Sequence, residues 1–463
     1  MLRLHDTATG EVRPLLSGGS EELRLYVCGP TVYGPPHSGH GRFTLVYDVL
    51  RKYLESTGVK VRHVSNVTDI DDKIIGLANA EGRRWDELAA DCEEAWWQSM
   101  DRMGVARPHE TPHATDFVGQ MIDLIAELVA RGAAYMISDG VYLSVAEVPG
   151  YGLLAQQPLE SLRAGARVEV DAEKRSPMDF ALWKLAKPGE PSWESPWGAG
   201  RPGWHTECVV MSLSLLGEGF ELHGGGDDLK FPHHENERAQ AVALGKTFAR
   251  HWMHNGMVEV SGRKMSKSLG NFTTLAELLS TVDGRAYRLL VMQAHYRAPM
   301  EVNADRLADC ARALGRLDGL ARRLAEARAA LPVGAPAAGP GRPVRDGIVS
   351  LSERFAERMD DDLDTPRAMA LVFDAVRSAN AALDSGRHEE GLRLAQEALS
   401  CAEAVGLRAS GELVVNEHAL SLAAKRDAAR AARDFSEADR LREQIVKLGY
   451  RVEDTATGTR VLR

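Results

Sequence analysis

The segment from Tyr26 to Arg42, YVCGPTVYGPPHSGHGR, constrains the fold more than any other part of the chain, because it joins an expected strand to an expected helix. Residues 23–27 alternate as in a half-buried strand that ends near Cys28. Glycines and prolines then break regular structure, and apolar residues at helical spacing follow. His37 and His40 are therefore expected at a helix N-terminus, where free N–H groups favour phosphate. The segment is a candidate nucleotide site.

A second strand is expected after this helix. Val59, Val61 and His63 alternate with polar residues and lead into a polar loop at residues 69–72. Strand, helix and strand in this order predict a right-handed parallel βαβ unit, whose ligands gather at the carboxyl ends of the strands. Both polar loops are then expected at the same edge of the sheet.

The rest of the chain divides by pattern. Its 463 residues favour about three domains. Residues 135–200 contain short strands and loops rich in Gly, Pro and Trp, which predicts an insertion between two halves of a nucleotide-binding fold, and the chain beyond Thr274 is almost wholly helical. We predict an α/β fold: a Rossmann-type parallel-sheet catalytic domain with an inserted connective domain, then a helical bundle and a small C-terminal domain.

Charge and composition narrow the class of protein. The net charge of -10 argues against indiscriminate nucleic-acid binding but allows a local basic surface that meets RNA. No apolar run approaches the roughly 18 residues of a membrane span, and the N-terminus lacks the apolar core of a signal peptide, so we expect a cytoplasmic protein that does not contact membranes. The five scattered cysteines suit free thiols or metal ligands better than disulfides.

Two short motifs point to phosphate chemistry. The first is HSGH at residues 37–40, and the second is KMSKS at residues 264–268. Each is weak alone, since Lys264 and Lys267 would also suit a solvated loop. Two lysines three apart, however, can reach around a triphosphate and offset the charge on departing pyrophosphate. HxGH followed by KMSKS is a specific pair that resembles class I aminoacyl-tRNA synthetases.

A second group of residues is a candidate metal site. Two thiols, an imidazole and a carboxylate make a plausible zinc set, in the residues Cys28, Cys208, His233 and Glu237. His233 and Glu237 are four apart and would share one helix face. A zinc protease is excluded, because HExxH would need a histidine where Arg238 stands. The cysteines are far apart in sequence, so spacing alone leaves buried free thiols as an alternative.

Longer strings make the resemblance closer than a class. Together they resemble the cysteinyl-tRNA synthetases and cover most of residues 23–275: YVCGPTVY, NVTDIDDKI, KRSPMDFALWK, PGWHTEC, HGGGDDLKFPHHENE and RKMSKSLGN. The segment MDDDLDTPRA at residues 359–368 is similar to the helical bundle of that family, and the tail is more loosely similar to its anticodon-binding domain. This sequence departs from the family pattern at Ser38, at two prolines before His37 and near Val461.

The resemblance implies how cysteine is selected. It implies one zinc ion per chain, bound by Cys28, Cys208, His233 and Glu237, with the substrate thiolate as a further ligand. A thiol loses its proton to zinc and binds strongly, whereas a serine hydroxyl is a much poorer ligand. The implied substrate-binding residues are Cys28, Thr68, Trp204 and His223. For Thr68 and Trp204 the alternatives are strand-end capping and core packing.

The resemblance also implies how ATP is used. Charge on the transferring and leaving phosphates would be stabilised by Mg²⁺ and by His37, His40, Lys264 and Lys267. The implied ATP-binding residues are His37, Gly39, His40, Gly224, Gly225, Gly226, Asp228 and Lys267. Glycine permits close backbone approach, and a carboxylate can accept from ribose hydroxyls. The carboxylate of cysteine would attack the α-phosphate, so no side-chain nucleophile is needed.

The implied function is activation of L-cysteine with ATP and its transfer to the 3′ end of tRNA(Cys), which would contact the helical bundle and the C-terminal domain of a monomer. The expected boundaries are 1–120 for the first half of the catalytic domain, 121–200 for the connective domain, 201–260 for the second half, 261–315 for the KMSKS loop and stem-contact region, 316–406 for the helical bundle and 407–463 for the anticodon-binding domain.

Two other functions compete with this one. A related ligase joins cysteine to glucosaminyl-inositol in mycothiol biosynthesis and would share the zinc site, but it has no use for the tail after residue 406. A non-catalytic paralogue that binds RNA or nucleotide is disfavoured by the intact HxGH, KMSKS and metal-ligand motifs.

Overall fold

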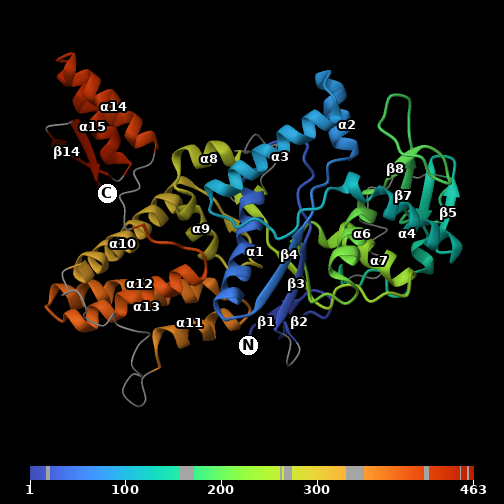
Figure 1. Ribbon diagram of the computed structural model, residues 1–463, viewed down its shortest axis with the longest axis horizontal. Coiled ribbons are helices and arrows are strands. Elements are labelled where there is room, and N and C mark those ends of the chain that lie inside the picture. The colour runs from blue at the N-terminus through green and yellow to red at the C-terminus, as the bar shows by residue number, and fades with distance from the viewer. Residues whose placement is uncertain are drawn as a thin grey trace. The chain divides into compact units, whose positions relative to one another are not determined.

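The computed structural model, drawn in Figure 1, describes residues 1–16, 21–156, 172–260, 263–264, 274–329, 349–410, 417–448, 450–455 and 458–462. The chain separates into two compact units. The first contains Met1–Pro35, Leu54–Gln98 and Ala106–Met257, and the second contains Pro36–Tyr53, Ser99–Val105 and Val258–Arg463. Within the described ranges, no helix is long and apolar enough to cross a membrane.

A four-stranded parallel sheet forms the centre of the first unit. Its strand order is β10-β9-β3-β4, with β3 at Glu22–Val27, β4 at Lys60–Ser65, β9 at Leu222–Gly226 and β10 at Trp252–Asn255. The predicted pairing of the first two strands is confirmed, since β3 and β4 run parallel with Leu25 opposite His63. The loops that follow them meet at one edge, where Thr31 pairs with Thr68. This is the edge where a parallel sheet binds ligands.

A separate antiparallel sheet of order β5-β6-β7-β8 lies in the inserted segment of the first unit. Its strands are Ala134–Ile137, Gly140–Leu143, Phe180–Leu185 and Gly200–Pro202, and α4 (Val118–Ala130) shares an apolar core with them. Short strands were predicted in this region from its composition. The other elements that lie mainly in this unit are β1 (Arg3–Asp6), β2 (Glu11–Pro14), α2 (Asp72–Glu81), α3 (Trp85–Arg102), η1 (Ala114–Phe117), η2 (Val145–Glu147), α6 (Trp204–Leu216), η3 (Lys230–His234) and α7 (Glu235–Ala243).

Helix α1 (Ser38–Ser56) follows β3 in the chain, and most of it belongs to the second unit. Its start is held by α9 (Gly284–Met292), because Tyr287 donates its hydroxyl hydrogen to the Ser38 carbonyl oxygen at 2.6 Å. Gly41 is needed here: a Cβ atom at this position would stand 3.0 Å from the Tyr287 ring and 3.1 Å from Leu275. The helix N-terminus predicted at the histidine motif is therefore present, and contacts with Tyr287 and Leu275 hold it in place.

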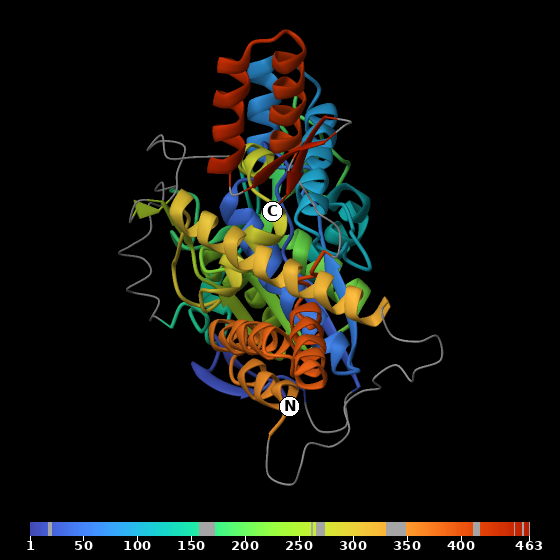
Figure 2. The same ribbon diagram turned by 90° about the vertical axis from the view of Figure 1, so that its left-hand side faces the viewer.

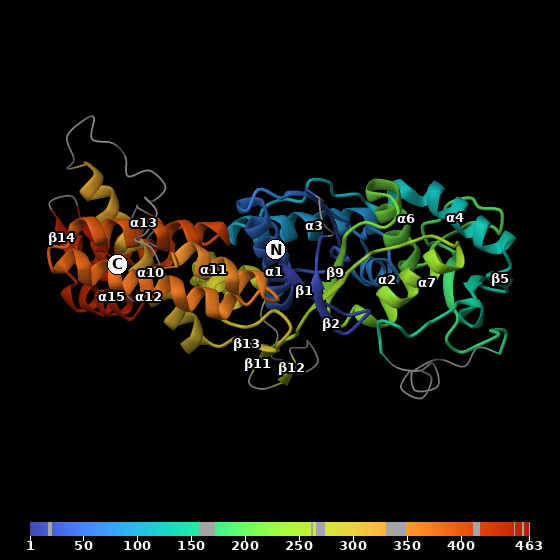
Figure 3. The same ribbon diagram turned by 90° about the horizontal axis from the view of Figure 1, so that it is seen from below.

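The remainder of the second unit is mainly helical. Its elements are β11 (Val258–Val260), β12 (Arg263–Lys264), α8 (Leu275–Thr281), β13 (Met300–Glu301), α10 (Ala304–Ala329), α11 (Leu351–Asp360), α12 (Thr365–Asp384), α13 (His388–Ala404), α14 (Glu417–Ala431), α15 (Phe435–Lys447), β14 (Arg451–Thr455) and β15 (Gly458–Leu462). Helices α14 and α15 lie side by side next to the β14–β15 hairpin (Figure 2), and α12 lies along α13 (Figure 3). The Pro/Gly/Ala stretch after Leu331 lies outside the described residues.

Candidate metal centre and nucleotide motif

Four side chains of the first unit converge on one buried point. Cys28 Sγ lies 3.6 Å from Cys208 Sγ and 3.3 Å from Glu237 Oε1. His233 Nε2 lies 3.6 Å from Cys208 Sγ and 2.8 Å from Glu237 Oε1. All four ligand atoms stand within 4.8 Å of one another, and all four residues are buried. The sequence-predicted metal set is therefore one cluster in space.

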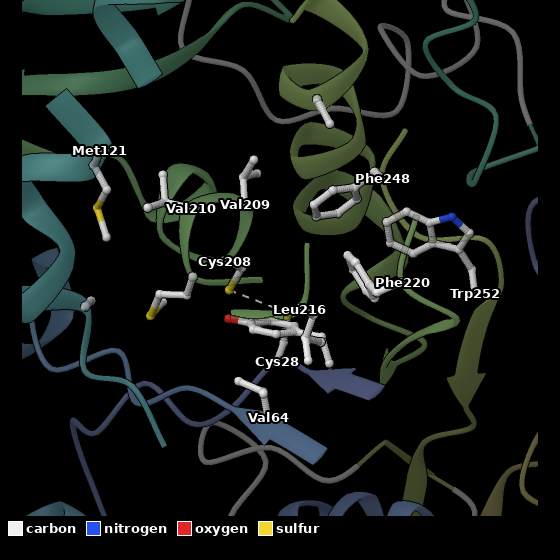
Figure 4. Packing of buried hydrophobic residues seen from close by; sticks show 14 of the residues in the cluster. Cys28, Val64, Met121, Cys208, Val209, Val210, Leu216, Phe220, Phe248 and Trp252 are labelled. Carbon is white, nitrogen blue, oxygen red and sulfur yellow. Dashed lines mark hydrogen bonds between the residues drawn. The ribbon is translucent and has the colours of Figure 1, made fainter. Parts of the chain in front are cut away.

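Each ligand is positioned by a different kind of local structure. Cys28 directly follows β3, and Cys208 lies in the first turns of α6, which packs against β3. His233 is the next-to-last residue of η3 and Glu237 lies in the first turn of α7, and the two side chains meet as their spacing predicted. Figure 4 shows Cys28 and Cys208 facing one another among apolar side chains that include Phe220.

The dimensions of the cluster fit a zinc ion. Around tetrahedral zinc, bonds of about 2.3 Å to sulfur and about 2.0 to 2.1 Å to nitrogen or oxygen place neighbouring ligand atoms about 3.3 to 3.8 Å apart. Three of the four measured separations, 3.3, 3.6 and 3.6 Å, fall in this range. The His233–Glu237 separation of 2.8 Å is shorter, because these two groups form an ion pair. A shift of about half an ångström would open it to ligand spacing.

The charges of the cluster also favour a cation at its centre. Burial acts to lower the pKa of His233, but Glu237 and Cys208 together raise it to about 10. Burial acts to raise the pKa of the Cys208 thiol, whereas hydrogen bonds from Cys28 and His233 lower it to about 6. Burial likewise opposes ionisation of Glu237, yet His223 and His233 hold its pKa well below its usual range. A positive charge among two anions is thus the stable arrangement, which is what a metal ion supplies.

Two further histidines contact the candidate ligands through atoms that face away from the centre of the cluster. His223 Nε2 lies 2.6 Å from the other oxygen of Glu237, and its ring stacks on Trp252 at 4.7 Å. His205 Nδ1 lies 3.0 Å from Nδ1 of His233, the ring nitrogen that faces away from the cluster. Burial and the neighbouring His233 hold the pKa of His205 well below its usual value. Such partners fix the ring orientation of a metal-binding histidine.

His223 also belongs to a second possible ligand group, Cys28, His223, His234 and Glu237. This group shares two members with the first but replaces a thiol and an imidazole by two imidazoles. Zinc prefers the sulfur-rich set, so Cys28, Cys208, His233 and Glu237 are the better candidate for a zinc site.

The predicted substrate residues Thr68 and Trp204 lie beside this cluster. Thr68 is 2 % exposed and donates to Glu207 Oε2 at 2.8 Å. Trp204 is the first residue of α6, and its ring stacks on His233 with centroids 4.1 Å apart. Trp204 thus contacts a candidate ligand directly, whereas Thr68 is linked to Cys208 through Asn66, which donates to Thr68 and lies 3.7 Å from the Cys208 sulfur.

The glycine run at the end of β9 allows close packing. A Cβ atom on Gly225 would stand 2.5 Å from His234 Cε1, so only glycine fits at this position. Gly224 pairs with Val27 of β3, and Gly226 stands next to the carboxylate of Asp228. These residues follow the carboxyl edge of the parallel sheet.

The histidine motif belongs to the second unit and has defined ring orientations. The rings of His37 and His40 stack with centroids 3.7 Å apart. The His37 backbone N–H donates to His40 Nδ1 at 3.3 Å, and the His40 backbone N–H donates to His37 Nδ1 at 3.4 Å. Since Nδ1 accepts in both rings, the neutral imidazoles carry their hydrogen on Nε2. Two N–H donors at a helix N-terminus suit an anionic ligand.

The second motif is described only in part. Lys264 is a residue of β12, and its backbone pairs with that of Glu259 in β11. Lys267 lies outside the described residues.

Two family models match the chain. Residues 16–312 match the model described as tRNA synthetases class I (C) catalytic domain, and residues 354–409 match the DALR domain. The solved methionyl-tRNA synthetase of Mycobacterium tuberculosis, in complex with methionyl-adenylate, has the same fold: the TM-score is 0.60 at 16 % identity, over 83 % of this chain and 90 % of that chain. The fold and the site together define a class I aminoacyl-tRNA synthetase.

Full-length relatives give the family. The chain is 41 % identical to the cysteine–tRNA ligase of Pelobacter propionicus and 41 % identical to that of Thermotoga maritima, in each case over 99 % of this chain and 99 % of the relative. The chain belongs to the cysteine–tRNA ligase family.

Sequence reasoning did not single out Asn66, His205 or Glu207. All three lie inside strings that the resemblance rests on, NVTDIDDKI and PGWHTEC. Each is polar and sits next to or near a ligand or substrate residue in sequence, and that position is the signal that could have found them.

Proposed function

We propose that this protein activates L-cysteine with ATP and transfers the cysteinyl group to the 3′ end of tRNA(Cys). The observation that carries the proposal is the buried cluster of two thiols, one imidazole and one carboxylate at ligand distances. In an enzyme that selects cysteine, such a cluster would hold a metal ion that binds the substrate thiolate.

The residues of the cluster would hold one zinc ion per chain, in the set Cys28, Cys208, His233 and Glu237. When bound, zinc supplies a Lewis acid that ionises the substrate thiol and binds the thiolate. Trp204 would pack beside the bound side chain, since its ring already covers His233. His223 would act through Glu237 by fixing one carboxylate oxygen at 2.6 Å. Thr68 would hold a backbone group of the substrate.

The phosphates of ATP would be bound by His37, Gly39 and His40 at the start of α1, where Nε2–H donors and backbone N–H groups favour anions. Lys264 and Lys267 would offset charge on the leaving pyrophosphate, together with Mg²⁺. The adenosine would lie along the glycine run of Gly224, Gly225 and Gly226, with Asp228 accepting from ribose hydroxyls. Positioning and electrostatics then carry the reaction, because the attacking nucleophile is the substrate's own carboxylate.

The tRNA would be bound by the helical region that includes the DALR domain and by the C-terminal domain, with the protein acting as a monomer in the cytoplasm. The expected boundaries, 316–406 for the bundle and 407–463 for the anticodon-binding domain, are part of this proposal. Relatives named cysteine–tRNA ligase span the full chain, which does not favour a glucosaminyl-inositol ligase or a non-catalytic paralogue.

The test is cysteine-dependent ATP–pyrophosphate exchange by the purified full-length protein, followed by charging of tRNA(Cys). We expect about one zinc per chain, exchange with cysteine, and exchange with serine slower by at least about 100-fold because a hydroxyl binds zinc poorly. The matched variant Cys208→Ser changes one ligand atom and should lose zinc and cysteine exchange together. Equal rates with serine and cysteine would contradict thiol recognition, and exchange without tRNA charging would contradict the proposed acceptor.

A further inference from the structure

A buried chain of hydrogen bonds runs beside the metal cluster, from the end of β3 to the first turn of α6. The Gly29 backbone N–H donates to Asn66 Oδ1 at 2.8 Å, and Asn66 Nδ2 donates to Thr68 Oγ1 at 3.2 Å. Thr68 Oγ1 in turn donates to Glu207 Oε2 at 2.8 Å. Three of these side chains are almost fully enclosed, with 1 % of Asn66, 2 % of Thr68 and 1 % of Glu207 exposed.

The direction of this chain is set at its first link. A peptide N–H can only donate, so the Asn66 oxygen faces Gly29 and the Asn66 amide nitrogen faces Thr68. The approach requires glycine, because a Cβ atom on Gly29 would stand 1.6 Å from the Asn66 carbonyl oxygen. The order of donors and acceptors is therefore fixed by the backbone N–H of Gly29, just after β3, and not by the side chains alone.

The consequence falls on the Thr68 hydroxyl. A hydroxyl has one hydrogen and two lone pairs, and Thr68 gives its hydrogen to Glu207 while one lone pair accepts from Asn66. What remains is one lone pair. In this state Thr68 can accept a further hydrogen bond but cannot donate one, so it suits an ammonium group and does not suit a carboxylate.

These hydrogen-bonded residues also lie close to Cys208, where the backbone of a metal-bound cysteine substrate would be. Asn66 Oδ1 is 3.7 Å from Cys208 Sγ, and Glu207 directly precedes Cys208 in α6. A cysteine held by its sulfur at the metal cluster carries its α-ammonium only a few bonds away. The ammonium and the carboxylate of that cysteine must be told apart, because only the carboxylate reacts with ATP.

We propose that Glu207 is a positioning residue for the α-ammonium of cysteine, acting through Thr68. This inference rests on the proposed function. By accepting the Thr68 hydrogen, Glu207 leaves the Thr68 hydroxyl oxygen as an acceptor only. The substrate carboxylate finds no hydrogen-bond donor at this oxygen, whereas the ammonium group can donate to it.

The test compares two ligands that differ only in the amino group. L-cysteine and 3-mercaptopropionate share the thiol and the carboxylate, and both are titrated calorimetrically into the zinc-loaded full-length protein. Glu207→Gln keeps the side-chain shape and can turn an N–H toward Thr68, so that the Thr68 oxygen would accept from it in place of the substrate. Thr68→Val removes the acceptor oxygen at constant shape, and it keeps the test informative if the first variant folds poorly. Thr68→Ser retains the hydroxyl and is the matched control.

We expect Glu207→Gln and Thr68→Val to weaken L-cysteine binding about 10- to 100-fold, since each removes the hydrogen-bond acceptor that Thr68 offers to an ammonium group. Binding of 3-mercaptopropionate should change by less than about 3-fold, and Thr68→Ser should change neither ligand by more than that. Bound zinc should stay at about one per chain in all three variants.

Three outcomes would overturn the proposal: equal losses for the two ligands, unchanged L-cysteine binding in both variants, or loss of zinc from Glu207→Gln. Each of these outcomes would mean that the hydrogen bonds from Gly29 to Glu207 only stabilise the fold and do not orient the substrate. Failure of the proposed function is a separate result, because it would appear in the unmodified protein as an absence of cysteine-dependent pyrophosphate exchange.

Discussion

Replacing His205 with phenylalanine tests whether the hydrogen bond from the proposed metal ligand His233 to His205 affects metal binding. His233 points Nε2 at Cys208 and Glu237, so its other nitrogen must meet His205 across 3.0 Å. Only one hydrogen fits between the two Nδ1 atoms. Burial and His233 hold the pKa of His205 well below its usual value, so His205 is neutral and accepts through Nδ1. His233 therefore donates from Nδ1 and is fixed in the tautomer that binds a metal through Nε2.

The expected magnitude follows from this single hydrogen bond. His205→Phe keeps an aromatic ring against Phe180, whose centroid lies 5.3 Å away, but leaves the His233 N–H without its acceptor. Loss of such an outer partner weakens metal binding about 10- to 100-fold, or about 1.4 to 2.7 kcal/mol. His205→Asn places a side-chain oxygen close to the former Nδ1 and should lose no more than about 3-fold.

The assay is competition for zinc between the protein and a chelator of known affinity at neutral pH. A second readout is the thermal stability of the metal-free protein, which separates packing from metal binding because His205→Phe keeps the ring contact with Phe180 and His205→Asn does not. The reasoning would be refuted by His205→Phe binding zinc within about 3-fold of the unmodified protein. It would also be refuted if His205→Asn lost as much affinity as His205→Phe, since packing and not the hydrogen bond would then be responsible.

Two further predictions concern stability. Arg288→Met should lower the unfolding free energy of the second unit by about 3 kcal/mol, because it breaks a buried ion pair of 2.5 Å with Asp48. Urea unfolding checks this, and a double variant that also carries Asp48→Asn should recover part of the loss. The His113–Glu93 pair, 2.9 Å apart, raises the pKa of His113 from 6.5 and lowers that of Glu93 from 4.5. The stabilisation of the folded state that comes from His113 is present below pH 6.5 and is lost as the pH rises through the raised pKa of His113. The stabilisation that comes from Glu93 is present above pH 4.5 and is lost as the pH falls through the lowered pKa of Glu93. Glu93→Gln should therefore lower the melting temperature most between pH 4.5 and pH 6.5. A fall in melting temperature that does not depend on pH would contradict a stabilising His113–Glu93 ion pair.

The parts of the fold that the sequence predicted are those encoded locally. The strand before Cys28 and the helix after His37 follow from side-chain periodicity, which needs no knowledge of distant residues. The parallel pairing of β3 with β4 follows from the order of elements. The position of β9 beside β3 could not be read in this way, because the strands are separated by the whole inserted segment and no local pattern specifies their pairing.

The candidate site was predictable to a different degree. Its four metal ligands came from the resemblance of whole strings, since spacing alone could not bring Cys28 to Cys208. The outer residues were missed for a physical reason: the roles of Asn66 and Glu207 depend on the direction of hydrogen bonds, which only the folded backbone sets. A buried polar residue within a motif can be flagged from sequence, but its donor or acceptor state cannot.

In the proposed cysteine site, Thr68 and Glu207 contribute to affinity, whereas the four candidate zinc ligands determine selectivity for the thiol. Serine carries the same ammonium and carboxylate as cysteine, so Thr68 and Glu207 interact with both amino acids alike. A change at either residue should therefore scale kcat/KM for cysteine and serine by one common factor. Discrimination must come from the four ligand side chains, because only there does sulfur replace oxygen next to a metal. A hydroxyl in that place would leave the metal poorly coordinated, and the penalty arises on binding, before any ATP is consumed.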